Sequence, residues 1–315
     1  MFDSETHQKG DDLEVMVKAS QIAEFLKLKL FGPDIDVMRP QSIDRPLSNS
    51  VVFVKEWRDY RRKNLEFIGN VLALIPDVVA WTDGKPQFSH ILCPNPRLAF
   101  ARVVRRFFVT QPQTGIAETA IVDASADIAD TASVGHYSII GENVIIGENT
   151  VIRNHVVIAD DVVIGNNCLI KSHAIIGEDG FGFEFDERSR HPERIPHTGS
   201  VVISDFVEVG AGSVVCQGTL DNTIIGPHTK LDDQVFIAHN VETGSNCLII
   251  AHAEISGSVK IGHNVWIGPG STVKEHVKIG DGAIIGIGAN VWSDVDTGVV
   301  VVGNPAKFLR MRDAG

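Results

Sequence analysis

The chain has little of what would tie it to nucleic acid or to a membrane. Its 28 Lys and Arg are outnumbered by 40 Asp and Glu, the formal net charge is −12, and the basic residues form no block. We therefore expect no nucleic-acid partner. The most apolar stretch, Val71–Trp81, is short and is broken by Pro76 and Asp77, so no membrane span is expected. The polar, acidic N-terminus also lacks the apolar core of a signal peptide.

Cysteine is scarce, and its spacing excludes the common cysteine-based sites. Cys93, Cys168, Cys216 and Cys247 show no CxxC or paired pattern. This spacing predicts reduced thiols in a cytoplasmic protein, with neither disulfides nor thiolate metal ligands. Twelve histidines are present, but none stands with a carboxylate and a third ligand at zinc-like spacing, so no metal site is expected.

The dominant pattern that is present is a hydrophobic period of six residues. It occupies 26 positions, of which only Thr243 is not aliphatic. Residues six apart lie on opposite sides of an α-helix, and a β-sandwich would show alternation with irregular turns. Hexapeptides of this kind predict a parallel β-helix of roughly nine triangular coils, 18 residues each and about 4.8 Å apart. The positions are Ile116, Val122, Ile128, Val134, Ile140, Ile146, Ile152, Ile158, Ile164, Ile170, Ile176, Ile203, Val209, Val215, Ile225, Leu231, Ile237, Thr243, Ile249, Ile255, Ile261, Ile267, Val273, Ile279, Ile285 and Val291.

A small α/β domain is expected before the repeats. After a flexible leader over residues 1–16, the domain covers residues 17–110, the β-helix residues 115–303 and a C-terminal tail residues 304–315. Helices are predicted over residues 18–28, with Ser20 as the cap, over residues 60–67, and over residues 97–108 after Asn95-Pro96. Strands are predicted over residues 51–54, 78–81 and 91–93.

Two interruptions of the repeat mark candidate binding loops. The repeat is lost over residues 178–200, where Phe181 and Phe183 stand among glycines. This loop could wrap a ligand, or it could be a solvated loop whose two Phe side chains pack against the prism. The second interruption adds four residues between Val215 and Ile225.

Most of the histidines fit solvated corner positions, and His155 and His173, 18 apart, should stack on adjacent coils. His239 differs because hydrogen-bonding side chains, among them Asp232, Gln234 and Asn240, stand close to it in the sequence. His276 follows two coils later. We expect the two histidines to lie roughly 10 Å apart across a groove.

Several motifs resemble one family within the hexapeptide acyltransferases, the UDP-3-O-acylglucosamine N-acyltransferases of lipid A biosynthesis. Residues 95–102 are similar to the family's nucleotide-binding domain, residues 177–183 and 195–199 to its long loop, and residues 237–241 to its catalytic segment. The chain departs from the pattern at Cys216-Gln217-Gly218, at Glu56-Trp57 before Tyr60, and at its ending. There, residues 300–307 resemble CoA-dependent sugar acetyltransferases of the same superfamily.

The resemblance implies a left-handed β-helix, a homotrimer with sites between neighbouring prisms, and a nucleotide-linked amino sugar as substrate. It implies that His239 is the general base and that His276 helps to stabilise the oxyanion or to hold the substrate. It implies no bound cofactor. The thioester donor would be an acyl carrier protein or CoA. Substrate-binding candidates are Tyr60, Asp179, Phe181, Gly182, Phe183, Asp232, Gln234 and Asn240; donor-binding candidates are Asn304, Lys307 and Arg310.

The function expected is N-acyl transfer from a hydroxyacyl thioester to a UDP-linked glucosamine. Such a reaction suits imidazole, because an attacking amine must lose a proton and histidine titrates near neutral pH. The alternatives are a CoA-dependent short-chain N-acyltransferase acting on a nucleotide-linked amino deoxysugar, and a non-catalytic trimeric β-helix scaffold.

Overall fold

The computed structural model describes residues 16–56, 70–78, 88–110 and 112–313. The chain divides into two compact units, Met1–Gln111 and Pro112–Gly315. Tyr60 and the helix expected over residues 60–67 lie outside the described residues. None of the helices in the described ranges has the length and hydropathy that crossing a bilayer requires.

The first unit is an α/β layer built on a five-stranded sheet in the order β2-β7-β6-β5-β4, antiparallel only between β2 and β7. Helices α1 and α3 pack with this sheet through a core that includes Ile22, Leu72 and Val103. The elements are β1 (Val17–Lys18), α1 (Ala19–Leu26), β2 (Leu30–Phe31), β3 (Asp36–Val37), β4 (Arg39–Pro40), β5 (Ser50–Phe53), β6 (Val71–Pro76), β7 (Ser89–Cys93), α3 (Pro96–Val103) and the π-helical turn η2 (Val104–Phe108).

One expectation for this unit was wrong, and another lies mostly outside the described residues. Of the strand expected over residues 78–81, the structure describes only Val78, which is exposed and follows β6. β6 is the central strand, and the run before Pro76 supplies side chains to the cores on both faces of the sheet, which explains its continuous hydrophobicity. Ser20 does not cap α1: Lys18 is the N-cap residue, and the Ser20 hydroxyl donates instead to Asp34. The Asn95 cap is confirmed, because its side chain accepts from the Leu98 N–H.

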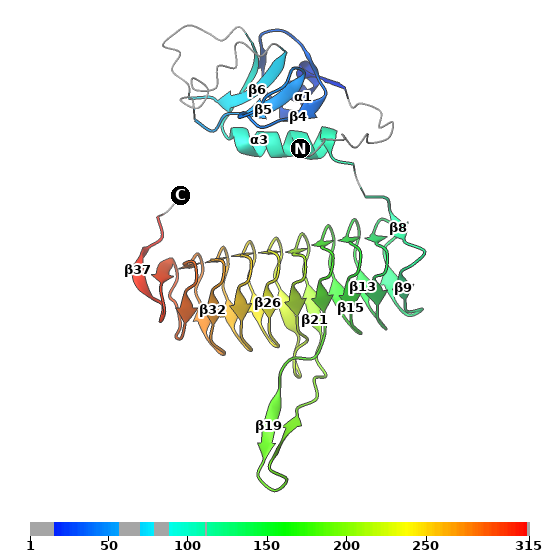
Figure 1. The fold of residues 1–315 in the computed structure, drawn as a ribbon, viewed down its shortest axis with the longest axis vertical. Helices are drawn as coiled ribbons and strands as arrows, with labels where there is room; N and C mark the ends of the chain where they lie inside the picture. The colour runs from blue at the N-terminus through cyan, green and yellow to red at the C-terminus, as the bar shows by residue number, and fades with distance from the viewer. Residues whose placement is uncertain (1–15, 57–69, 79–87, 111, 314–315) are drawn as a thin grey trace, which may run out of the picture. The chain divides into compact units, whose positions relative to one another are not determined.

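The second unit is a parallel β-helix whose coils run through three sheets (Figure 1). Outside the two insertions and the last coil, each strand pairs with the strand 18 residues later, as Ile140 does with Ile158. We name the sheets by their first and last strands. The β8–β37 sheet contains β8 (Gly115–Ile116), β11 (Ser133–Val134), β14 (Val151–Ile152), β17 (Leu169–Ile170), β22 (Glu208–Val209), β25 (Lys230–Leu231), β28 (Leu248–Ile249), β31 (Trp266–Ile267), β34 (Ile284–Ile285), β36 (Val299–Val302) and the antiparallel β37 (Lys307–Met311).

The β9–β35 sheet has nine strands, one for each of the roughly nine coils expected. They are β9 (Ile121–Val122), β12 (Ile139–Ile140), β15 (Val157–Ile158), β18 (Ile175–Ile176), β23 (Val214–Val215), β26 (Phe236–Ile237), β29 (Glu254–Ile255), β32 (Thr272–Val273) and β35 (Asn290–Val291). The β10–β33 sheet contains β10 (Asp127–Ile128), β13 (Ile145–Ile146), β16 (Val163–Ile164), β21 (Val201–Ile203), β24 (Thr223–Ile225), β27 (Glu242–Thr243), β30 (Lys260–Ile261) and β33 (Lys278–Ile279).

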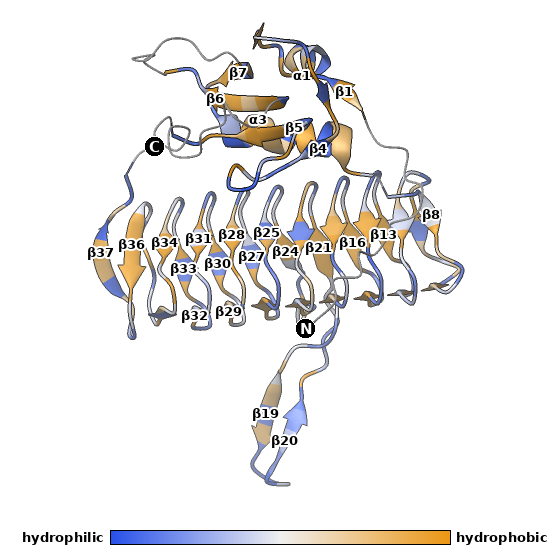
Figure 2. Ribbon diagram, turned by 45° about the horizontal axis from the view of Figure 1, so that its top comes forward, coloured by the Kyte–Doolittle hydropathy of each residue, from blue (hydrophilic) through white to orange (hydrophobic). Residues whose placement is uncertain are grey.

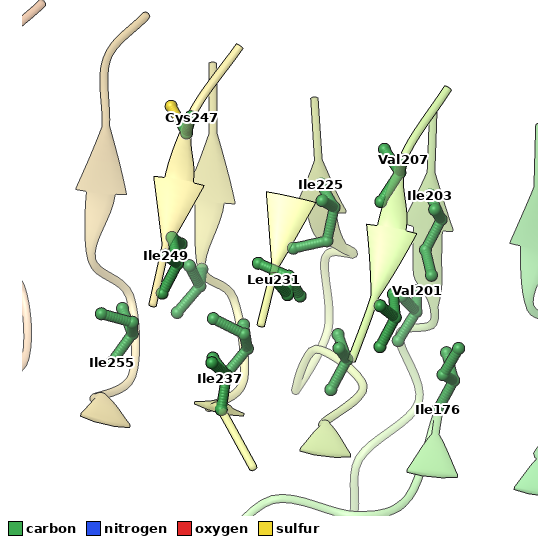
Figure 3. Packing of buried hydrophobic residues seen from close by; sticks show 14 of the residues in the cluster. Ile176, Val201, Ile203, Val207, Ile225, Leu231, Ile237, Cys247, Ile249 and Ile255 are labelled. Atoms are coloured by element: carbon green, nitrogen blue, oxygen red, sulfur yellow. The ribbon is translucent and has the colours of Figure 1, made fainter. Parts of the chain in front are cut away.

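The six-residue positions form the core of the prism. From Val134 to Val291 all of them are buried in one continuous cluster or, for Thr243, beside it. Figure 3 shows the middle part of this cluster, with Ile176 and Ile255 among its labelled residues. The Thr243 hydroxyl has a partner, because it accepts a hydrogen bond of 2.9 Å from the Gly226 N–H. Only the first coils depart from the expectation. Ile116 is 51% exposed, since no earlier coil covers it.

The corners explain five of the histidines. At most corners the chain turns through a residue with positive φ, a conformation that Asn, Asp and Gly tolerate well and that His adopts more often than most residues. Five of the twelve histidines occupy such positions, and among them the rings of His155 and His173 stack at 5.0 Å as predicted. The five are His155, His173, His228, His252 and His276. His239 is not among them, because the corner residue beside it is Asn240.

Both interruptions of the repeat lie where the sequence predicts them. The residues between β18 and β21 form an antiparallel hairpin of β19 (Phe183–Asp186) and β20 (His191–Arg194) that extends away from the coils (Figures 1 and 2). Phe181 is 87% exposed, so of the two alternatives left open for this loop, packing of both Phe side chains on the prism does not hold. The shorter insertion, residues 218–221, bulges from the coil between β23 and β24.

Candidate active site

The site is built on the corner that joins the β9–β35 sheet to the β10–β33 sheet, which we call the His239 corner. β26 ends at Ile237 with its side chain in the core, the buried Ala238 follows, and His239 and Asn240 make the turn. Asn240 takes φ of 59°, a left-handed conformation that asparagine tolerates. The core register therefore fixes where the His239 side chain starts.

Hydrogen bonds fix the orientation of the Asn240 amide. Its Nδ2 donates to the Asp221 carbonyl at 3.0 Å, and its Oδ1 accepts from the Thr219 N–H at 3.0 Å. The short insertion supplies both partners. The same Oδ1 lies 3.1 Å from Nδ1 of His239. Because this oxygen can only accept, Nδ1 of His239 carries the proton and Nε2 keeps its lone pair.

Two glycines leave room for the His239 ring. A Cβ on Gly257, one coil further, would lie 2.7 Å from Nε2 of His239, and one on Gly180 would lie 3.0 Å from its Cδ2. Neither glycine has a left-handed φ, so the requirement is for space. Among the described residues, the Gly257 N–H has no hydrogen-bond acceptor. An unpaired N–H beside a basic nitrogen is the combination that acyl transfer needs.

A groove of 560 Å³ runs along the same corner. Its lining includes Asn240 and His276, two coils apart as expected, together with Thr219. His239 borders this groove through Thr219, whose hydroxyl lies 3.4 Å from Nδ1. Lys260 and Lys278 continue the lining along the β10–β33 sheet, with Lys260 bonded to Glu242.

The long loop closes the other side of His239. The Gln217 side chain donates to Asp179 at 2.7 Å, and Arg194 lies 3.6 Å from the same carboxylate. The Arg194 guanidinium also covers the Phe183 ring at 4.7 Å. Gly180 and Gly182 both border the His197 ring, so Asp179 and Gly182 belong to the loop base. Phe181 and Phe183 stand beside them with their rings 4.8 Å apart, and the Phe181 side chain is exposed.

The other predicted residues lie elsewhere in the unit. Asp232 and Gln234 occupy the corner between the β8–β37 and β9–β35 sheets, so one chain does not bring them to the His239 corner. Asp232 accepts there from the Ala251 N–H. Asn304 follows β36, and Lys307 and Arg310 are in β37. β36 is four strands from β25, the strand of the His239 coil, which is about 19 Å along the axis.

The described residues contain no group of three His, Cys, Asp or Glu side chains placed to hold a metal ion. All four cysteines are free and buried. Burial raises the pKa of the Cys216 thiol to about 11, with Glu178 and Asp179 adding to the effect. Although it stands near the loop base, Cys216 is therefore a neutral packing group and a poor nucleophile.

Comparison with known proteins agrees with this geometry. The family model for bacterial transferase hexapeptides (six repeats) matches residues 143–178 and 258–291. The UDP-3-O-acylglucosamine N-acyltransferase of Campylobacter curvus is 41% identical over 247 residues, covering 75% of this chain and 76% of that protein. The chain belongs to the UDP-3-O-acylglucosamine N-acyltransferase family. It is thus an acyltransferase of the hexapeptide-repeat kind.

Other family members and solved structures extend the comparison. UDP-3-O-acylglucosamine N-acyltransferase 1 of Francisella tularensis is 40% identical over 182 residues, 52% of each chain. The crystal structure of UDP-N-acetylglucosamine O-acyltransferase from Moraxella catarrhalis gives a TM-score of 0.58 at 32% identity, covering 62% of this chain and 74% of that one. With the hexapeptide match, this neighbour supports the left-handed β-helix expected from the family resemblance.

Sequence reasoning missed three residues that the structure brings to His239. Gly257 could have been found, because it lies one 18-residue coil after His239. Thr219 and His197 could not, since each belongs to an insertion where the period gives no register. The His197 ring lies 5.5 Å from that of His239, at 78° to it.

Proposed function

We propose that this protein transfers a hydroxyacyl group from an acyl carrier protein thioester to the amine of UDP-3-O-acylglucosamine, a step of lipid A biosynthesis. Family membership supports the reaction class, and the relatives' names supply the acceptor. The observation that carries the proposal is the hydrogen bond that fixes the His239 tautomer. Oδ1 of Asn240 accepts from the Nδ1–H of His239, which leaves the Nε2 lone pair free to act as a base.

The reaction follows from these groups. The acceptor amine attacks the thioester carbonyl, and Nε2 of His239 removes a proton as the C–N bond forms. The oxyanion of the tetrahedral intermediate accepts from the Gly257 N–H, and His276, further along the groove, holds the acceptor or adds a second donor. The C–S bond then breaks. The imidazolium returns its proton to the departing thiolate, which leaves as the free thiol.

The remaining predicted residues take peripheral roles in this proposal. Asp179, Phe181, Gly182 and Phe183 form the loop side of the acceptor site, and Tyr60 remains the candidate for stacking on the nucleotide base. Lys307 and Arg310, on the exposed β37, are too far along the axis to reach the thioester. They suit the acidic surface of a carrier protein or the phosphate of its arm.

We propose a homotrimer in the cytoplasm. The outward face of the β9–β35 sheet carries apolar residues on six consecutive strands, β9 to β26, directly beside the His239 corner. A second chain on that face would bury the stripe and complete the groove. It could also bring the corner with Asp232 and Gln234 to the site of a neighbour. The four buried free thiols fit a reducing compartment.

The test is thiol release by the purified protein with hydroxyacyl–acyl carrier protein and acetyl-CoA offered separately, each with UDP-3-O-acylglucosamine or its unacylated form. We expect turnover only with the carrier protein and the O-acylated acceptor. His239→Ala should lower kcat on the order of 10²–10⁴-fold with the circular dichroism spectrum unchanged. Turnover with CoA alone would reassign the protein to short-chain transfer, and no turnover with any pair would leave the β-helix as a scaffold. Wild-type activity in His239→Ala would remove His239 as the base.

A further inference from the structure

The base of the long loop contains an imidazole with an unusual environment. His197 is only 9% exposed, and its Nε2 is one of two buried side-chain polar atoms without a hydrogen-bond partner among the described residues. Its Nδ1 lies 3.0 Å from the Ile195 carbonyl. Because a carbonyl only accepts, Nδ1 carries the proton and the unpaired atom is a bare lone pair. Buried acceptors are rarely left this way, so the position calls for a reason other than hydrogen bonding.

The ring of His197 packs edge to face on His239. Their centroids are 5.5 Å apart and the planes meet at 78°. Gly180 lies between the two: a Cβ there would be 2.9 Å from Nε2 of His197 and 3.0 Å from Cδ2 of His239. Gly182 leaves similar room, since its Cβ would lie 2.9 Å from Cε1 of His197. Two glycines thus allow the loop backbone to close on both rings.

The His239 ring is therefore restrained on several sides. Asn240 fixes its Nδ1, Gly257 borders its Nε2, and His197 with Gly180 covers the face toward the loop. The first two restraints come from the coils, but the third arrives only when the long loop is folded over the corner. Removing it would let the imidazole rotate about χ2, a torsion with broad wells.

We propose that His197 is a positioning residue for His239: it holds the imidazole in the plane set by Asn240 and makes that alignment depend on closure of the loop. This inference rests on the proposed function, in which His239 is the base. His197 itself exchanges no proton with the substrate.

The experiment compares His197→Ala, His197→Gln and His191→Ala in the full-length protein. His191 is an exposed residue on β20 of the same loop and serves as the matched control. We expect His197→Ala to lower kcat roughly 10- to 100-fold with KM for both substrates close to wild type, because misalignment of a reacting group costs about that much. His197→Gln keeps a donor for Ile195 and a polar edge toward His239, so it should recover most of the rate.

The tautomer of His239 separates alignment from general loop packing. Nitrogen NMR of His239 should show the Nδ1–H tautomer in wild type and His191→Ala, and averaging of the two tautomers in His197→Ala. The charged groups at the loop base, Glu178, Asp179 and Arg194, are the same in every variant.

The outcomes distinguish this inference from the proposed function. An inactive His239→Ala with a fully active His197→Ala would overturn the role of His197 alone. A rise in KM with kcat and tautomer unchanged would do so too, because it would make His197 a packing residue of the loop. Wild-type activity in His239→Ala would instead remove His239 as the base, and no turnover by the wild type would remove the proposed function. If His197→Ala does not fold, the rate and the tautomer in His197→Gln decide.

Discussion

The side-chain oxygen of Asn240 lies 3.1 Å from Nδ1 of His239 and already accepts a hydrogen bond from the backbone of Thr219. Its amide nitrogen is engaged by Asp221, so the group cannot flip without losing both bonds. A four-residue insertion in a regular coil thereby determines which nitrogen of the neighbouring imidazole is the base. The tautomer of His239 therefore depends on the conformation of the insertion.

Asn240→Gly tests this relationship. Glycine accepts the φ of 59° at this corner, so the backbone should be kept while the tautomer lock is lost. We expect kcat to fall on the order of 100-fold, measured as thiol release. Asn264→Gly is the control, because Asn264 has a φ of 57° at a corner away from the site. A rate in Asn240→Gly equal to that of the control would show that the amide does not set the base.

Thr243→Val tests the one polar side chain among the inward positions. The Thr243 hydroxyl accepts from the Gly226 N–H, and valine would leave that donor buried and unpaired. The free energy of unfolding should drop by about 1–3 kcal/mol in spite of the added methyl group. Urea unfolding at a fixed protein concentration measures it. Equal or greater stability would mean that Gly226 finds another acceptor.

The sequence predicts the β-helix well because one physical requirement repeats 26 times. Each coil must put an aliphatic side chain into the prism and turn at a corner, so the register carries from Val134 to Val291 with two insertions at the expected places. β6, over residues 71–76 for which the sequence predicts no strand, shows the opposite case. A short apolar run without a period gives no register, and pairing with the neighbouring strands β5 and β7 decides where β6 lies.

Site residues in the regular coils can likewise be predicted from the sequence, whereas those in the insertions cannot. His239, Asn240 and His276 follow from the coil period, which places them along one corner. His197 and Thr219 lie in insertions, and their contacts depend on how a loop folds back over a coil. The period also misleads in one respect. Asp232 and Gln234 are near His239 in sequence, yet a coil turns 120° between successive corners of a triangular prism, so they lie at the preceding corner.

Ile139→Asp tests the apolar stripe on the β9–β35 sheet. Ile139 points outward and is 44% exposed in the single chain, and a carboxylate there would be buried against a second copy. We expect light scattering after gel filtration to show monomers in place of trimers, with loss of acyl transfer. Ile145→Asp, 46% exposed on the β10–β33 sheet, is the matched control and should remain trimeric. Dissociation in Ile145→Asp alone would place the interface on the other sheet.

The buried thiols should make stability fall at alkaline pH. Burial raises the pKa of Cys93 and of Cys216 from 9.0 to about 11 in the folded chain. Below pH 9 both thiols are protonated whether the chain is folded or not, so their full contribution to the free energy of unfolding is present. Between pH 9 and 11 only the unfolded chain ionises them, and each thiol should remove up to about 1.4 kcal/mol of stability per pH unit.

Urea unfolding at pH 8, 9, 10 and 11 measures this loss, and Cys93→Ala/Cys216→Ala is the comparison. The double variant starts from lower stability but should lose it less steeply, because the groups that bind extra protons in the folded state are gone. Parallel curves for the two proteins would show that other groups, such as lysines, cause the alkaline loss. The native protein should also react slowly with a thiol reagent at pH 8, since a neutral buried thiol is neither accessible nor nucleophilic.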